Sequence, residues 1–410
     1  MDISGEALDR LARIGDPEAD GVVAELVEQG RLGDVNRVLR QWRPADADVP
    51  AALPAVLREF LLTARRTPEW ADRERLARVQ RFFADDGIHV GTVLALGSMA
   101  MANAVPLSAR AVHLTHRLHH PERRSAHTAQ FVFDLMQPNP FGTGGRFAVS
   151  AVKVRLIHAT VRHHLLATGA WDRHRHGAPA SQEHLLIVWM ALSVQVLDFL
   201  ERLRIRVSAQ EAEDYLHIWR VAGALLGIDA AAMPPTVGEA RQLFATALAR
   251  SAGPSPEGAE LTRHLLDLYA GVLPGRAFDG VVPALLRRLI GRDVADWLAV
   301  PHSPLWQGVL RGYLGLLALV DRIEDRSWLG RRVRDRLGRF QHAVELRILT
   351  RGRTAGLELP AELVACGSGI SVPRPRSGQE AERAGDREAV PILAVDEQGI
   401  ARKGDGTYSG

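Results

Sequence analysis

The segment GRFAVSAVKVRLIHATVRHHLLA, residues 145–167, contains the pattern that decides the fold. Its apolar residues recur at spacings of three and four, which is typical of an α-helix. At about 100° per residue, one stripe roughly 80° wide holds two alanines, two arginines and a histidine, namely Ala148, Ala151, Arg155, His158 and Arg162. A histidine that follows two alanines leaves a flat space beside its ring, where a planar macrocycle would fit. The alternative is a surface stripe with one core histidine.

The same helical periodicity extends to both sides of this segment. Three short helices are expected before residue 44, and the later ones at 52–65, 68–85, 87–104, 106–117, 121–136, 145–167, 181–206, 209–227, 236–251, 257–272, 281–298, 305–322 and 327–352. Alternating strand patterns are nearly absent, and 392–395 is the one candidate. The sequence therefore predicts an all-α, multi-helix protein.

Composition shifts divide the chain into three parts. We predict an N-terminal helical extension at residues 1–50 and the main helical domain at 51–355. Residues 367–410 are rich in Gly, Pro, Ser and charged residues, which predicts a flexible tail. A long loop at 136–145 lies between two helices, and such loops are often part of a binding site.

Composition also excludes several functional classes. With 46% hydrophobic residues in 410, the chain can bury a core, and global disorder is excluded. One cysteine, Cys366, excludes disulfides and multi-thiolate metal sites. The net charge is +3 and arginines alternate with acidic residues, so no basic block indicates nucleic acid. The most apolar stretch, 90–105, is interrupted by polar residues, which predicts a buried helix and no stable membrane insertion. An N-terminus without a basic region or an apolar core predicts a cytoplasmic protein.

Eleven of the sixteen histidines lie between His113 and His184, so a site that uses imidazole is expected there. The helix at 121–136 carries Arg124, His127 and Thr128 on one face. Arginine and threonine together offer hydrogen-bond donors for bound oxygen or an oxyanion, and His127 is a candidate base or second metal ligand.

Two other metal sites compete with this interpretation. A carboxylate-bridged di-iron bundle needs Glu-x-x-His pairs on two helices, and the nearest matches are Asp214-x-x-His217 and the reversed His342-x-x-Glu345. A mononuclear zinc site could use the three histidines of one helix face, His113, His116 and His120, although no carboxylate lies in register with them.

Three segments carry a family resemblance. Residues 154–163, VRLIHATVRH, resemble the central motif of the family that contains latex clearing protein (rubber oxygenase) and the MpaB-type oxygenase of mycophenolic acid biosynthesis. Residues 124–128, RSAHT, resemble that family's Arg-x-x-Lys-Thr segment. Residues 215–228, YLHIWRVAGALLGI, are similar to its His-x-Trp-Arg followed by Leu-Gly-Ile.

The resemblance implies a globin-like helical core that holds one haem b without covalent attachment. His158 matches the proximal iron ligand, a usual role for neutral imidazole. Arg155, Arg162 and His163 match residues around the cofactor, and the pair Arg124 and Thr128 matches residues that assist oxygen activation on the distal side.

Two departures from the family pattern alter the expected chemistry. His127 stands where the rubber oxygenases have a lysine, so it is a possible distal iron ligand. No acidic residue in 98–120 matches the glutamate proposed as the base in rubber cleavage. Because no export signal is apparent and rubber is an extracellular polymer, a small apolar or isoprenoid-like substrate is expected.

The resulting prediction is a haem-dependent oxygenase that uses O2. The alternatives are a haem-binding sensor or accessory protein without turnover, and a haem peroxidase-like enzyme. The substrate and the oligomeric state do not follow from the sequence.

Overall fold

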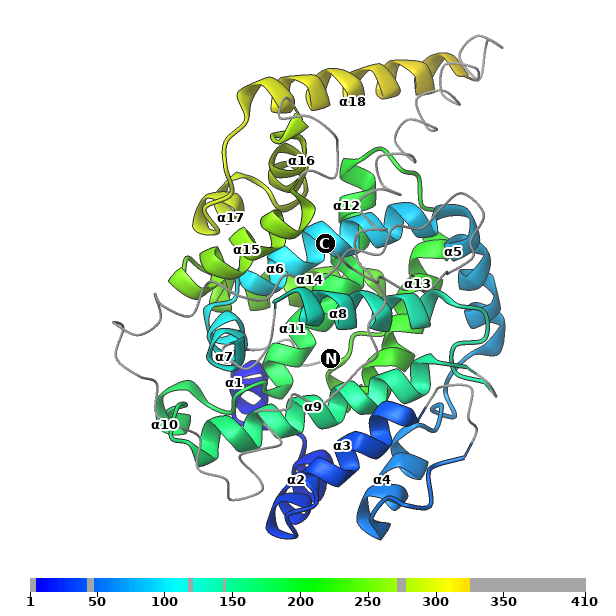
Figure 1. Cartoon of the computed structure of the whole chain (residues 1–410). Helices are drawn as coiled ribbons and strands as arrows, with labels where there is room; N and C mark the ends of the chain where they lie inside the picture. The colour runs from blue at the N-terminus through cyan, green and yellow to red at the C-terminus, as the bar shows by residue number, and fades with distance from the viewer. Residues whose placement is uncertain (1–4, 43–47, 117–120, 143–144, 271–277, 325–410) are drawn as a thin grey trace, which may run out of the picture. The chain divides into compact units, whose positions relative to one another are not determined.

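The fold is entirely helical over the residues that the computed structural model describes, which are 5–42, 48–116, 121–142, 145–270 and 278–324 (Figure 1). No strand occurs within these ranges. The predicted all-α class is confirmed. The expected helix at 327–352, the strand candidate at 392–395 and the tail at 367–410 lie outside them, and the three-part division of the chain stays a prediction.

The first helices form a group that precedes the main body of the chain. They are α1 (Gly5–Ala12), α2 (Pro17–Glu28), α3 (Leu32–Gln41) and α4 (Ala55–Ala64). The central helices are α5 (Arg73–Val93), the π-helical turn η1 (Leu94–Ser98), α6 (Met99–Asn103), α7 (Pro106–His116), α8 (Pro121–Met136), α9 (Phe147–Ala167) and α10 (Arg173–His176). The remaining helices are α11 (Gln182–Leu192), α12 (Val194–Arg202), α13 (Ala209–Leu225), the 3₁₀ turn η2 (Ala230–Ala232), α14 (Val237–Ser251), α15 (Pro256–Tyr269), α16 (Val281–Ile290), α17 (Arg292–Trp297) and α18 (Pro304–Glu324).

Several helices begin where the local sequence supplies a cap. The Asp16 side chain accepts a hydrogen bond from the Ala19 N–H at the start of α2, and Pro17 occupies the first turn. Ser208 and Glu211 form a capping box at the start of α13. These side chains accept hydrogen bonds from backbone N–H groups that have no partner within the helix.

Three helix boundaries differ from the sequence-based prediction. The predicted helices at 68–85 and 87–104 are one continuous run, α5–η1–α6, because Gly87 does not interrupt the helical hydrogen bonds. The predicted helix at 181–206 is divided at Ser193 (φ −106°, ψ −93°), and the one at 281–298 at Gly291, whose φ is +85°. Apolar periodicity continues through both breaks, so periodicity alone could not show them.

Besides a small third cluster that holds Ala111, Leu165 and Trp171, two large hydrophobic clusters organise the described residues. The larger one draws on α5, η1, α6, α8 and most helices from α11 to α17. The smaller one joins α2, α3 and α4 to α9. Helix α9 contributes to both: Phe147, Ala148 and Ala151 to the larger, and Val149 and Val152 to the smaller. Helices α2, α3 and α4 therefore pack with the helix that carries the central motif, as Figure 1 shows, whereas Leu8 of α1 belongs to the larger cluster.

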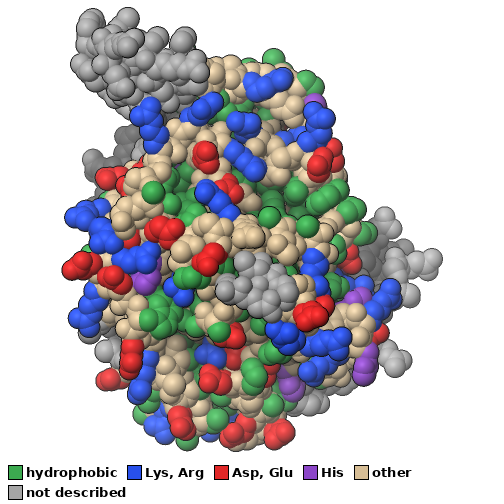
Figure 2. Space-filling model, turned by 180° about the vertical axis from the view of Figure 1, so that it is seen from behind, with side chains coloured by type: hydrophobic (Ala, Val, Ile, Leu, Met, Phe, Trp, Pro, Cys, Tyr) green, Lys and Arg blue, Asp and Glu red, His purple; other side chains and the backbone are tan. Residues whose placement is uncertain are grey.

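Within the described residues, 182–202, which span α11 and α12, are long and apolar enough to cross a membrane, but 89% of their apolar window is buried within the protein. Helices 73–103 and 106–115 pass the same test only together, and they are bent by 100° at the break between them. A core helix of a globular protein has the same property. Figure 2 shows Lys and Arg side chains and Asp and Glu side chains spread together over one face of the molecule.

Candidate functional site

Helix α9 is long enough to place His158 near its middle, with Arg155 one turn before and Arg162 one turn after. The His158 ring is partly buried, and its Nδ1 atom is buried without a hydrogen-bond partner. Burial, reinforced by the positive charge of Arg162, lowers the pKa of His158 to about 4. The imidazole is therefore neutral near pH 7 and keeps a lone pair for a metal.

The two arginines of this stripe bind carboxylates of α2. Both Nε and Nη2 of Arg155 contact the Asp16 carboxylate, and Nη2 lies 2.8 Å from Glu18 Oε2. Nε of Arg162 donates to Asp20 Oδ1 at 2.7 Å. The family resemblance predicts that these two arginines lie around the cofactor. In the structure both bind carboxylates at the start of α2.

Arg162 retains one unused donor. Its Nη1 donates to the Ala180 carbonyl at 3.1 Å, whereas its Nη2 is buried without a partner. A buried N–H group without an acceptor is uncommon. Arg162 therefore keeps a donor for a bound group, whereas Nε and Nη2 of Arg155 bind Asp16 and Glu18.

His163, which the sequence placed near the cofactor, is partly buried on α9. The next residue, His164, is also partly buried, and burial together with the charge of His163 lowers the pKa of His164. The structure does not bring the side chain of His163 into a defined contact with His158.

The expected distal residues lie on α8, which begins and ends at the predicted positions, Pro121 and Met136. Thr128 is partly buried. The side chains of Arg124 and His127 lie outside the described part of the structure, so their predicted roles stay predictions.

Helix α8 packs against α9 through contacts that the sequence did not reveal. The rings of Phe131 and Phe147 have centroids 4.8 Å apart. The hydroxyl of Ser150 donates to the carboxylate of Asp134, which is 2% exposed. A single aspartate in an amphipathic helix is usually exposed to solvent. The sequence therefore contained no sign that Asp134 is buried against α9.

Asp214 and His217, which the competing di-iron interpretation would need as iron ligands, bind other groups of the protein. Asp214 forms ion pairs with Arg75 at 3.1 Å and Arg78 at 2.6 Å. Nε2 of His217 accepts a hydrogen bond from the Asp72 N–H at 2.9 Å. Within the described ranges, no three His, Cys, Asp or Glu side chains gather in a way that could hold a metal ion.

For the zinc alternative, only His113 has a described side-chain partner, because the side chain of His116 and residue His120 lie outside the described part. Nδ1 of His113 lies 3.3 Å from Glu260 Oε2. His342, of the second di-iron pattern, also lies outside it.

The Leu-Gly-Ile segment of the third motif contacts the central motif. Gly227 has a φ of +78°, and a Cβ atom at this position would collide with Arg155 Nε and Asp16 Oδ2. Only glycine accommodates both the left-handed backbone and this close approach. The side-chain amide of Gln182 donates to the carbonyls of Gly227 at 2.8 Å and Gly15 at 3.0 Å.

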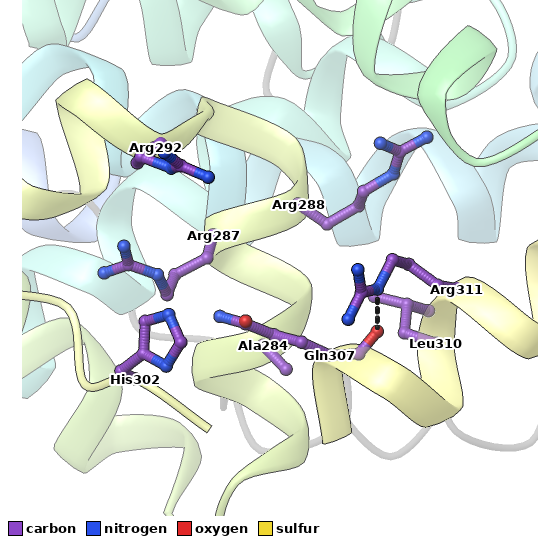
Figure 3. A pocket seen from close by; sticks show the side chains of 8 residues that line it. All are labelled: Ala284, Arg287, Arg288, Arg292, His302, Gln307, Leu310 and Arg311. Atoms are coloured by element: carbon purple, nitrogen blue, oxygen red, sulfur yellow. Dashed lines mark hydrogen bonds between the residues drawn. The ribbon is translucent and has the colours of Figure 1, made fainter. Parts of the chain in front are cut away.

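A separate hollow of about 230 Å³ lies between α16, α17 and α18. Figure 3 shows its arginines, of which Arg287 is already bound to Asp296 and to the Val300 carbonyl. Arg288, Arg292 and Arg311 are exposed. The hollow has no lining residue from α8 or α9, so it is not the site predicted from the motifs.

Comparisons with known proteins agree with the motif analysis. A family described as "ER-bound oxygenase mpaB/B'/Rubber oxygenase, catalytic domain" matches residues 80–319. A rubber oxygenase from Streptomyces sp. (strain K30) is 33% identical over 299 residues, which are 72% of this chain and 73% of the relative. The solved structure of latex clearing protein LCP in the closed state matches with a TM-score of 0.74 and 30% identity, over 85% of this chain and 94% of that one. The chain therefore belongs to the family of the ER-bound oxygenase mpaB and the rubber oxygenases, and residues 80–319 form its oxygenase catalytic domain.

Proposed function

We propose that this protein is a haem b-dependent oxygenase that uses O2 to oxidise a small apolar or isoprenoid-like compound, by cleaving or oxygenating a C=C bond. The similarity to a rubber oxygenase supports an apolar, isoprenoid-like substrate. The preference for a small compound over a polymer, and a cytoplasmic location, are part of this proposal.

The observation that carries the proposal is the state of His158. A partly buried imidazole that is neutral near pH 7, with one ring nitrogen buried and unpaired, has the properties of an axial iron ligand. The unpaired Nη2 of Arg162, one turn away, could donate to an anionic group of the cofactor. These residues fit a haem.

When bound, haem supplies the redox-active iron for chemistry with dioxygen. The protein itself binds the cofactor, excludes water and supplies hydrogen-bond donors. His158 would bind the iron through a neutral ring nitrogen. The buried apolar residues on both sides of α9 exclude water. The Thr128 hydroxyl and, by family resemblance, the Arg124 guanidinium are the proposed donors on the distal side, where they would stabilise developing negative charge.

The test compares the wild-type protein with His158→Ala, and uses His174→Ala, an exposed residue of α10, as the matched control. After haem reconstitution, wild type and His174→Ala should show a Soret band and consume O2 with a short isoprenoid alkene, which mass spectrometry would show as an oxidised product. His158→Ala should remain helical by circular dichroism but retain little haem, because it lacks the iron ligand.

Other outcomes would separate the alternatives. Full haem occupancy in His158→Ala would contradict the ligand assignment. A haem spectrum without O2 consumption would indicate a sensor or accessory protein, and activity only with peroxide would indicate a peroxidase-like enzyme.

A further inference from the structure

Two ion pairs flank His158 and join α9 to α2. Arg155, one turn before the histidine, binds Asp16, and Arg162, one turn after it, binds Asp20. Asp16 and Arg162 each have side chains 3% exposed, and Arg155 has 9%. Helix α2 lies outside residues 80–319, which match the oxygenase family.

Asp16 makes hydrogen bonds to α9, to α2 and to Asp20. Its carboxylate binds Arg155 through two nitrogens, and it also caps α2 by accepting from the Ala19 N–H at 3.3 Å. Its own backbone N–H donates to Asp20 Oδ2 at 3.1 Å. The backbone of Asp16 is thus hydrogen-bonded to the carboxylate that binds Arg162.

Two glycines allow the backbone to approach the ion pairs closely. Added Cβ atoms would collide with Asp16 and Arg155 at Gly227, and with Asp20 and Arg162 at Gly15. The close approach of both glycines shows that the guanidinium groups lie directly against the backbone. Gln182 joins these two glycines by hydrogen bonds to their carbonyls.

A bidentate arginine–carboxylate pair fixes orientation as well as distance. The Arg155–Asp16 pair is of this kind, whereas Arg162 binds Asp20 through Nε alone. One ion pair on each side of His158 thus links α9 to α2 and opposes rotation of α9 about its own axis at the turn that carries the imidazole. Because the Arg155–Asp16 pair is buried, removing Asp16 leaves an uncompensated charge, and the helix must shift to solvate it. The Arg162–Asp20 pair is less enclosed, since the side chain of Asp20 is 36% exposed.

We propose that Asp16 is a positioning residue for His158: through its ion pair with Arg155, it sets the orientation in which α9 presents the imidazole to iron. Asp20 serves the same purpose through Arg162. The proposal rests on the proposed haem-binding function. It gives the N-terminal helices a part in the cofactor site.

The main test is Asp16→Asn, with Glu18→Gln as the matched control. Asparagine keeps the shape of aspartate and can still cap α2, so only the charge of the pair is lost. Glu18 contacts the same arginine, but its side chain is 72% exposed, so its ion pair should matter little.

In ferrous holoprotein, resonance Raman spectroscopy measures the iron–histidine stretching frequency, which reports the orientation of the axial imidazole. Asp16→Asn should shift or broaden this band and should accelerate haem transfer to apomyoglobin on the order of 10-fold, as for other partners that orient metal ligands. Glu18→Gln should match the wild type in both measurements. An unchanged band and transfer rate in Asp16→Asn would overturn the proposal.

A double variant separates positioning from general stability. Asp16→Asn/Arg155→Gln removes both charges, so the thermal stability lost in Asp16→Asn should return. If Asp16 positions His158, the altered iron–histidine band should persist in the double variant. If the band returns to the wild-type position together with stability, Asp16 has only a structural role and the proposal fails. The double variant also provides the test if Asp16→Asn does not fold.

A second readout does not require haem. With ¹³C-labelled histidine, the ring resonance of His158, assigned by its loss in His158→Ala, should shift or split in Asp16→Asn and in the double variant but not in Glu18→Gln. A resonance unchanged in all variants would overturn the positioning role. A wild-type protein that takes up no haem would instead overturn the proposed function, so the two failures are distinguishable.

Discussion

Three buried or partly buried histidines have their pKa lowered to about 4, mainly by burial, and they serve different purposes. His217 uses its Nε2 to accept from the Asp72 N–H, so its lone pair is occupied. His158 has no such partner. Residues of the same type and charge state therefore differ in their contacts: Nε2 of His217 is bound to a backbone N–H, whereas Nδ1 of His158 has no hydrogen-bond partner.

At the residue scale, the first prediction concerns His127. It replaces the lysine that the family's rubber oxygenases carry beside Thr128, and a neutral imidazole is a stronger iron ligand than a protonated lysine. Ferric holoprotein should be six-coordinate and low-spin at pH 8. Lowering the pH toward 5 should protonate and release the imidazole, because a proton and iron compete for one lone pair.

Absorption and electron paramagnetic resonance spectra measure this spin state. His127→Ala should be high-spin or water-ligated at both pH values, while His174→Ala, at an exposed position of α10, should behave as the wild type. A wild-type spectrum that is high-spin from pH 5 to 8 and unaltered by His127→Ala would show that His127 does not bind iron.

At the element scale, α9 obtains its orientation from the helices on both sides of it. Its apolar residues face the larger cluster on one side and the helices α2–α4 on the other, so little of the helix is solvated. The end of α13 completes this packing, because Gly227 follows the helix and contacts the Arg155–Asp16 pair. A substitution at Gly227 should therefore alter the packing of α9.

The second prediction tests that contact with Gly227→Ala. The matched control is Gly169→Ala, since Gly169 has a similar φ of +68° but no atom within 4 Å of an added Cβ. The control should lose about 1 kcal/mol of unfolding free energy from the left-handed backbone alone. Gly227→Ala should lose about 2–3 kcal/mol or more, because overpacking adds to this cost. Urea unfolding monitored by circular dichroism measures both, and equal losses would contradict the predicted clash.

At the scale of the whole molecule, neutral buried histidines make stability depend on pH. In the unfolded chain His184 and His217 titrate near 6.5, and in the folded protein near 4. Between these values the unfolded state binds more protons, so stability is fully present above pH 6.5 and falls as the pH falls toward 4.

The third prediction is a lower urea midpoint at pH 5 than at pH 7.5. Each histidine contributes at most about 1.4 kcal/mol per pH unit within this window. His184→Gln should reduce the pH dependence, whereas exposed His174→Gln should leave it unchanged. A midpoint that is constant, or that rises on acidification, would contradict the assignment of neutral buried histidines.

The sequence by itself determined the helical class, the bounds of α8 and the family. These follow from local patterns: apolar spacing sets a helix, and proline or a capping residue sets its start. The position of His158 on α9 also follows from local spacing, as does the presence of Arg155 and Arg162 one turn to either side.

Only the tertiary structure decided what those arginines bind. Asp16 is 139 residues from Arg155 and Asp20 is 142 from Arg162, and no local pattern relates charges at such separations. The breaks at Ser193 and Gly291 were also beyond the sequence, because apolar periodicity continues through them. Helix periodicity records which face of a segment is buried, whereas the partner that covers this face depends on how the whole chain packs.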